Sequence, residues 1–116
     1  MTGDELAGLL ERGEVALLDV RTRVEYEGES GYPCDPRQGH IPGAVHLNVD
    51  ELHAAAGDAA ALRGLLSERG VDPGVRVVTY CHSGQRSEIA AALLRAAGVD
   101  AVNYSGSWHE WSRRPE

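Results

Sequence analysis

A cysteine, a glycine and an arginine lie close together between positions 81 and 86, in the segment Cys-His-Ser-Gly-Gln-Arg. The β-branched run Arg76–Tyr80 predicts a strand that ends directly before Cys81, and Ser87 is placed to cap a following helix. Backbone N–H groups of such a short loop can converge on one point, and the dipole of the next helix adds partial positive charge there. Both effects favour an anion, so the pattern predicts that Cys81 is a nucleophilic thiolate at neutral pH.

The other residues of this loop fit an anionic substrate. Arg86 and His82 supply positive charge, which either lowers the pKa of the Cys81 thiol further or holds the substrate. The loop residues expected to contact the substrate, besides these two, are Ser83, Gly84, Gln85 and Ser87. The alternative is an inert cysteine that simply ends a strand.

Two other predicted strands also end in polar residues. The continuous apolar run 15–18 is typical of a strand buried on both faces, and Asp19 and Arg21 follow it. Ser105 and Gly106 follow a predicted strand at 101–104. In open α/β sheets, sites form beyond the carboxyl ends of the strands, so we expect these residues near the cysteine loop.

Strands and helices alternate along the chain. The predicted strands cover 15–18, 45–47, Arg76–Tyr80 and 101–104. Helices are predicted after the Thr2 capping box, over 22–27, from Asn48 or Asp50, over 58–69, from Ser87 to Gly98 and around Trp108 and Trp111, while 28–39 reads as an irregular loop. This order predicts one α/β domain over residues 1–116, an open parallel sheet with helices on both faces.

Composition and charge exclude several classes of protein. The chain has 18 acidic residues against 11 arginines and no lysine, a formal charge of −7, which argues against a nucleic-acid partner. The apolar runs are too short for a membrane span, and the acidic N-terminus differs from a signal peptide, so we expect a cytoplasmic protein that does not bind membranes. The two cysteines do not form a CxxC motif, and the five histidines lack zinc-site spacing, so neither a metal nor a cofactor is expected.

The loop at 81–87 closely resembles the active-site loop of the rhodanese (sulfurtransferase) family. Three more segments are similar to family signatures, and they occur in the family's order: Asp-Val-Arg at 19–21, Gly-His-Ile-Pro-Gly-Ala at 39–44 and Tyr-Ser-Gly-Ser-Trp-His-Glu-Trp at 104–111. Together the four segments span nearly the whole chain. The stretches at 35–40 and 106–111 look like the catalytic half of tandem-domain sulfurtransferases, although this chain has room for one such domain.

The resemblance implies a rhodanese-like sheet of about five strands and a transfer of sulfane sulfur in two steps. Cys81 would take the outer sulfur of thiosulfate or a similar small anionic donor, and the persulfide would pass it to cyanide or to a thiol, either a small molecule or a thioredoxin-like protein. Arg86 would face the sulfonate of the donor or support the loop. Asp19 would hold the loop by pairing with Arg21 or Arg86, and Arg37 would reach the substrate or remain solvated.

Three other functions use the same residues. Cysteine phosphatases and arsenate reductases need a wider Cys-x5-Arg loop, whereas four residues separate Cys81 from Arg86 here, and Asp35 is a weak candidate for their acid. A persulfide relay would accept sulfur from a partner protein. A regulatory rhodanese module often lacks the cysteine that this chain retains.

For two further residues, Cys34 and His40, we consider both a chemical and a purely structural role. Cys34 either resolves an oxidised Cys81 through a disulfide or is an exposed spare thiol. His40 is expected to be a hydrogen-bonding residue of the 39–44 turn and not a base.

Overall fold

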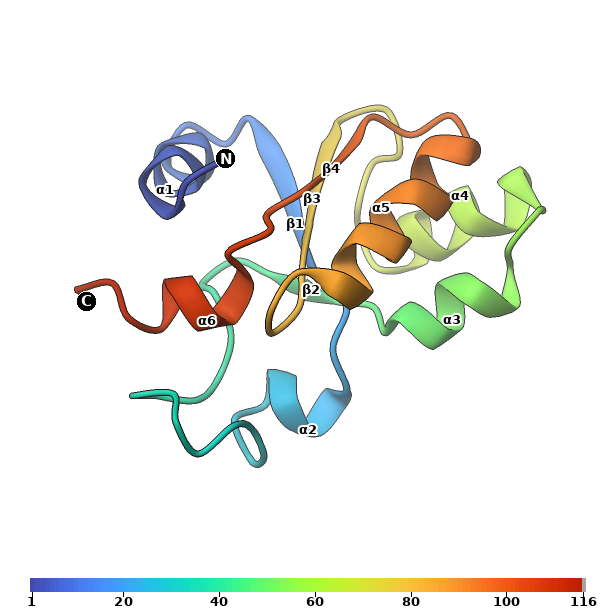
Figure 1. Ribbon diagram of the computed structural model, residues 1–116. Helices are drawn as coiled ribbons and strands as arrows, with labels where there is room; N and C mark the ends of the chain where they lie inside the picture. Colours follow the sequence, from blue (N-terminus) through green and yellow to red (C-terminus); the bar gives the residue numbers. More distant parts are fainter. Residues whose placement is uncertain (116) are drawn as a thin grey trace.

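The computed structural model describes residues 1–115 and contains an open, fully parallel sheet (Figure 1). Its strands are β1 (Val15–Asp19), β2 (Val45–His46), β3 (Arg76–Tyr80) and β4 (Ala101–Asn103), in the spatial order β2-β1-β3-β4. The α/β class is confirmed. The expected count of about five strands is wrong, because the described residues form a 4-stranded sheet and the capping box at Thr2 commits the segment before β1 to a helix.

Helices cover both faces of the sheet, as expected (Figure 1). They are α1 (Gly3–Glu11), α2 (Arg23–Tyr26), α3 (Val49–Ala54), α4 (Ala59–Glu68), α5 (Gln85–Ala96) and α6 (Ser107–Trp111). Helices α1 and α6 lie on one face, and α3, α4 and α5 lie on the other. None of the helices in residues 1–115 is long and apolar enough to cross a membrane.

The alternation of side chains along the strands divides the core in two. Leu17 and Val78 pack with Trp108 in the cluster under α1 and α6. Their neighbours Leu18 and Val77 pack in the cluster under α3, α4 and α5. Successive residues of a strand point to opposite faces, so a strand in the middle of the sheet is buried on both faces and is mostly apolar.

The helices begin where the sequence predicts, except for α5, the helix that follows Cys81. Thr2, Thr22, Asn48 and Asp58 each accept a hydrogen bond at the start of their helix. The prediction that Ser87 caps a helix is wrong: α5 begins at Gln85, and the capping position is Gly84. A glycine with φ of +95° turns the chain sharply enough for the helix to begin earlier.

The carboxyl ends of β1, β3 and β4 meet at one edge of the sheet. Asp19 is in register with Tyr80, and Thr79 is in register with Asn103. The loop after β3, helix α2 and segment 28–39 gather at this same end (Figure 1). The edge that sequence analysis singled out is therefore the edge at which the cysteine lies.

Candidate active site

The Cys81 thiol is buried in a cradle of hydrogen-bond donors; the residue is 1% exposed. The Gly84 amide donates to Cys81 Sγ at 3.1 Å, and the Ser87 hydroxyl donates to it at 3.3 Å. Burial opposes ionisation, but hydrogen bonds from the Ser87 hydroxyl and from the amides of Ser87, Gly84 and Ser83 outweigh it. The pKa of Cys81 is therefore lowered from its ordinary value, which favours the nucleophilic thiolate.

Gly84 shapes this cradle in a way that no other residue type matches. Its φ is +95°, and a Cβ atom at this position would lie 2.6 Å from the carbonyl oxygen of Ser105. The side-chain amide of Asn103, at the end of β4, donates to the Gly84 carbonyl at 3.0 Å. The cysteine loop is therefore packed directly against the chain that leaves β4.

Helix α6 fixes the backbone at Cys81. The Cys81 amide donates to Ser107 Oγ at 3.1 Å, and the Trp108 amide donates to the Cys81 carbonyl at 2.9 Å. Ser107 has a φ of +54°, the only positive value outside glycine in residues 1–115. A strained backbone of this kind persists where surrounding contacts hold it, and here those contacts position Cys81.

Arg86 is paired with an acid that sequence analysis did not select. Its guanidinium donates to both carboxylate oxygens of Glu25, at 2.9 and 3.1 Å. Burial would raise the pKa of Glu25, but hydrogen bonds from Arg86 and Thr22 lower it to about 2. Glu25 is thus ionised at neutral pH, and the positive charge expected to face the substrate is balanced within the protein.

Asp19 and Arg21 form a buried ion pair, with 2.6 Å between Arg21 Nη2 and Asp19 Oδ2. Of the two arginines considered as partners for Asp19, Arg21 is the one the structure places against it. The Tyr80 hydroxyl donates to Asp19 at 2.7 Å, and Arg21 Nη2 donates to the Gly39 carbonyl at 2.6 Å. The pair thus joins the end of β3, directly before Cys81, to the 39–44 turn.

His82 turns its ring toward Asp35 and Tyr32. His82 Nε2 lies 2.9 Å from Asp35 Oδ2, and the ring stacks on Tyr32 with centroids 3.7 Å apart. Asp35 is also held by Arg113, whose Nη1 donates to Oδ1 at 2.9 Å. The weak candidate for a phosphatase acid is therefore a buried partner of a histidine and an arginine. Ser83 and Gln85 are exposed at the rim of the loop.

Arg37 and Cys34 lie on the loop over 28–39, and neither is among the residues that donate hydrogen bonds to Cys81 Sγ. Arg37 Nη2 donates to the Trp111 carbonyl at 3.0 Å, and the Trp108 indole donates to the Arg37 carbonyl. Arg37 therefore connects this loop to α6. Cys34 is exposed whereas Cys81 is buried.

His40 is a hydrogen-bonding residue of the turn, as expected. Its Nδ1 lies 2.9 Å from the Tyr26 carbonyl, and its ring stacks on Tyr26 with centroids 3.9 Å apart.

Three residues that hold the site, Glu25, Asn103 and Ser107, were not predicted from the sequence. A signal existed for two of them. Glu25 is the acid of the Thr22 capping box, directly after the Asp-Val-Arg segment, and Ser107 directly follows the strand end at Ser105 and Gly106. Nothing in the sequence joins Glu25 to Arg86, which lies 61 residues away.

Comparison with known proteins gives a consistent result. A family model described as a rhodanese-like domain matches residues 2–114. A putative thiosulfate sulfurtransferase, SseB of Mycobacterium tuberculosis, is 41% identical over 106 residues, which is 89% of this chain and 37% of that protein. A human thiosulfate:glutathione sulfurtransferase is 36% identical over 110 residues, which is 92% of this chain and 87% of that protein.

A solved structure shares the fold. The crystal structure of a probable thiosulfate sulfurtransferase superposes with a TM-score of 0.77 at 42% identity, covering 97% of this chain and 44% of the other. The chain thus spans less than half the length of that protein and of the mycobacterial relative.

Proposed function

The chain belongs to the family of rhodanese-like domains, and we propose that it is a sulfurtransferase that carries sulfane sulfur on Cys81. The main support for this proposal is that the Cys81 sulfur accepts hydrogen bonds from Gly84 and Ser87 at the start of α5. These donors stabilise a negative charge on sulfur in a buried site, and both the resting thiolate and a persulfide carry that charge.

In the first step, the Cys81 thiolate attacks the outer sulfur of thiosulfate. The sulfur–sulfur bond of thiosulfate breaks, sulfite leaves with the bonding electron pair, and Cys81 holds the transferred sulfur as an anionic persulfide. The covalent intermediate divides one difficult transfer into two easier steps. The loop amides need not move during the reaction, so their dipoles are already aimed at the developing charge.

In the second step, cyanide or a thiolate attacks the outer sulfur of the persulfide, and the Cys81 thiolate leaves. The human relative is named for glutathione as its acceptor, and this supports a small thiol in the same role here. A thioredoxin-like protein is the second kind of acceptor that we propose.

A polar pocket beside Arg86 is the proposed approach for the donor. It has a volume of about 260 Å³ and is lined by Thr22, Glu25, Ser30, Gly31, Tyr32 and Arg86. Arg86 can hydrogen-bond to a sulfonate there, but Glu25 already accepts from both of its terminal nitrogens. We expect weak binding of the thiosulfate dianion for this reason.

The same ion pair favours a second candidate function, a persulfide relay. A partner protein that delivers sulfur by docking gains its affinity from its whole surface and does not depend on a free cation beside Cys81. The relay uses Cys81, Gly84 and Ser87 in the same roles. The two functions differ in the donor.

The experiment that tests the proposal is turnover of thiosulfate and cyanide to thiocyanate. We expect wild-type protein to turn over and Cys81→Ala to be inactive. Cys34→Ala is the matched control, since it removes the other, exposed thiol, and we expect it to keep wild-type activity. Equal activity in Cys81→Ala and wild type would refute the assignment of the nucleophile.

A further inference from the structure

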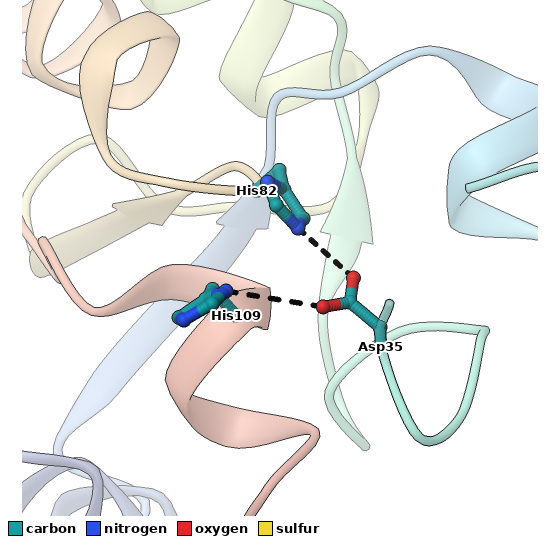
Figure 2. Close-up of side chains that lie close together, drawn as sticks. All are labelled: Asp35, His82 and His109. Atoms are coloured by element: carbon teal, nitrogen blue, oxygen red, sulfur yellow. Dashed lines mark hydrogen bonds and ion pairs between the residues drawn. The ribbon is translucent and has the colours of Figure 1, made fainter. Parts of the chain in front are cut away.

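A second group of chemistry-bearing side chains lies beside the cysteine loop. Within residues 1–115, Asp35, His82 and His109 place one ligand atom each so that all three lie within 4.8 Å of one another. Figure 2 shows the three side chains converging from the loop over 28–39, from the cysteine loop and from α6. The spacing of the histidines along the sequence gave no sign of this cluster.

The distances are close to those of a metal site. His82 Nε2 lies 2.9 Å from Asp35 Oδ2, and His109 Nδ1 lies 3.9 Å from Asp35 Oδ1. Zinc holds nitrogen and oxygen ligands at about 2.0–2.2 Å, which in a tetrahedron separates the ligand atoms by about 3.4 Å. The observed distances, one to each oxygen of Asp35, lie on both sides of this value, and one ligand atom from each of the three residues lies within 4.8 Å of the others. Side-chain rotations can therefore bring the donors onto one ion.

Two of the ligands are already oriented. The Asp35 side chain is fully buried, and the His82 ring is stacked on Tyr32. The His109 amide donates to the His82 carbonyl at 2.9 Å, which fixes α6 to the cysteine loop. The His109 side chain is 53% exposed, so an ion can reach the site from solvent and water can complete its coordination.

Arg113 is the charged neighbour that such an ion would face. It donates to Asp35 Oδ1, to the His109 carbonyl and to the Cys34 carbonyl. A carboxylate has lone pairs to spare, so Asp35 can keep Arg113 on Oδ1 while Oδ2 binds the ion. The guanidinium repels the ion, and we therefore expect a weaker site than a structural zinc centre.

We propose that Asp35 Oδ2, His82 Nε2 and His109 Nδ1 bind a divalent transition-metal ion of the zinc and cobalt class. Imidazole nitrogen suits these ions, whereas magnesium and calcium prefer sites made of oxygen alone. Each imidazole donates the lone pair of the named nitrogen: a neutral ring carries its proton on the other nitrogen when the ion is bound, and a protonated ring releases one proton to solvent on binding. The ion ties together the three segments that frame Cys81.

The test uses the full chain carrying the two substitutions Cys34→Ser and Cys81→Ser. This protein is titrated with Co²⁺, with binding monitored by the visible absorption of the cobalt ion, and separately with Zn²⁺, with binding measured by calorimetry. The two serines remove thiolates that would compete for the ions. We expect one ion per chain and an affinity that His109→Asn lowers by more than about tenfold. A Zn²⁺-dependent rise in melting temperature should accompany binding and disappear in the same variant.

His53→Asn is the matched control, because His53 is an exposed histidine of α3 outside the cluster. We expect this variant to bind as the parent does. His109 is also half exposed, so its replacement tests the ligand without disturbing the core. Absence of stoichiometric binding, or equal affinities of the His109→Asn and parent proteins, would overturn the proposal. Neither result bears on sulfur transfer, which is measured separately.

Discussion

Glu25 and Arg86 form a bidentate ion pair that joins the capping box of α2 to the first turn of α5. The pair has two effects on the site. It holds Arg86 beside the cysteine loop, and it neutralises the cation that would otherwise attract an anionic donor. The KM for thiosulfate in variants of Glu25 measures which of these two effects dominates.

Replacing Glu25 with glutamine should improve the use of thiosulfate. Glutamine still accepts from Thr22 in the capping box, while the charge of Arg86 becomes available to the donor. We expect the KM for thiosulfate to fall by about threefold to tenfold, which corresponds to roughly 1 kcal/mol, with little change in kcat. Steady-state kinetics at fixed ionic strength measure both values.

Glu27→Gln is the matched control for Glu25→Gln. Glu27 caps the end of the same helix and pairs with Arg23 at 3.3 Å on the surface. The Glu27→Gln substitution removes the same charge from the chain as Glu25→Gln does, but it leaves the ion pair between Arg86 and Glu25 intact. A rise in the KM of Glu25→Gln would contradict the expectation and show that Arg86 works only when Glu25 positions it.

Replacing Ser87 with alanine should raise the pKa of Cys81. The Ser87 hydroxyl donates to the sulfur and so stabilises the thiolate; without it, ionisation needs a higher pH. The pH midpoint of alkylation by iodoacetamide should move upward, by at most about one unit for a single neutral hydrogen bond. Ser83→Ala keeps the amide that contacts the sulfur and should leave the midpoint in place. A downward shift in Ser87→Ala would refute this account of the thiolate.

Most of the fold can be predicted from the sequence, because local patterns of apolar runs and helix-capping residues determine its strands and helices. The apolar run before Asp19 and the β-branched run before Cys81 are buried strands, and Thr2, Thr22 and Asp58 start helices as their side chains predict. The error at Ser87 is also local. The positive φ of Gly84 sets where α5 begins, and that angle is not visible in the residue type alone.

The site is only partly readable, because several of its contacts join distant segments. Cys81 stands out through its position between a strand and a helix. The pairing of Glu25 with Arg86 spans 61 residues, and that of Asp35 with His82 spans 47. Such pairs depend on how the loop over 28–39 folds back over the sheet edge, and no periodicity encodes that path.

Removing the Ser107 hydroxyl should destabilise the protein. The variant Ser107→Ala leaves the buried Cys81 amide without its acceptor, and we expect a loss of about 1–3 kcal/mol in the free energy of unfolding measured in urea. Ser107→Gly separates the hydroxyl from the backbone strain, since glycine accepts the positive φ but lacks the acceptor. A Ser107→Ala protein as stable as wild type would mean that the hydroxyl contributes nothing to stability.

A methyl group at Gly84 should disrupt the cradle. In Gly84→Ala the new Cβ atom would meet the Ser105 carbonyl at 2.6 Å with φ at +95°. We expect activity to fall by more than about tenfold and stability by about 1–3 kcal/mol. Gly64→Ala lies in α4 with open space around the new atom, and it should stabilise the protein by about 0.5–1 kcal/mol. Wild-type activity in Gly84→Ala would contradict the assigned role of this glycine.

Whether Cys81 carries sulfane sulfur is decided by the intact mass of the protein after treatment with thiosulfate and removal of excess donor. We expect the mass of one added sulfur atom on wild type and on Cys34→Ser, none on Cys81→Ser, and loss of the added mass when cyanide is supplied. An unmodified wild-type protein, or the same added mass on Cys81→Ser, would contradict this expectation.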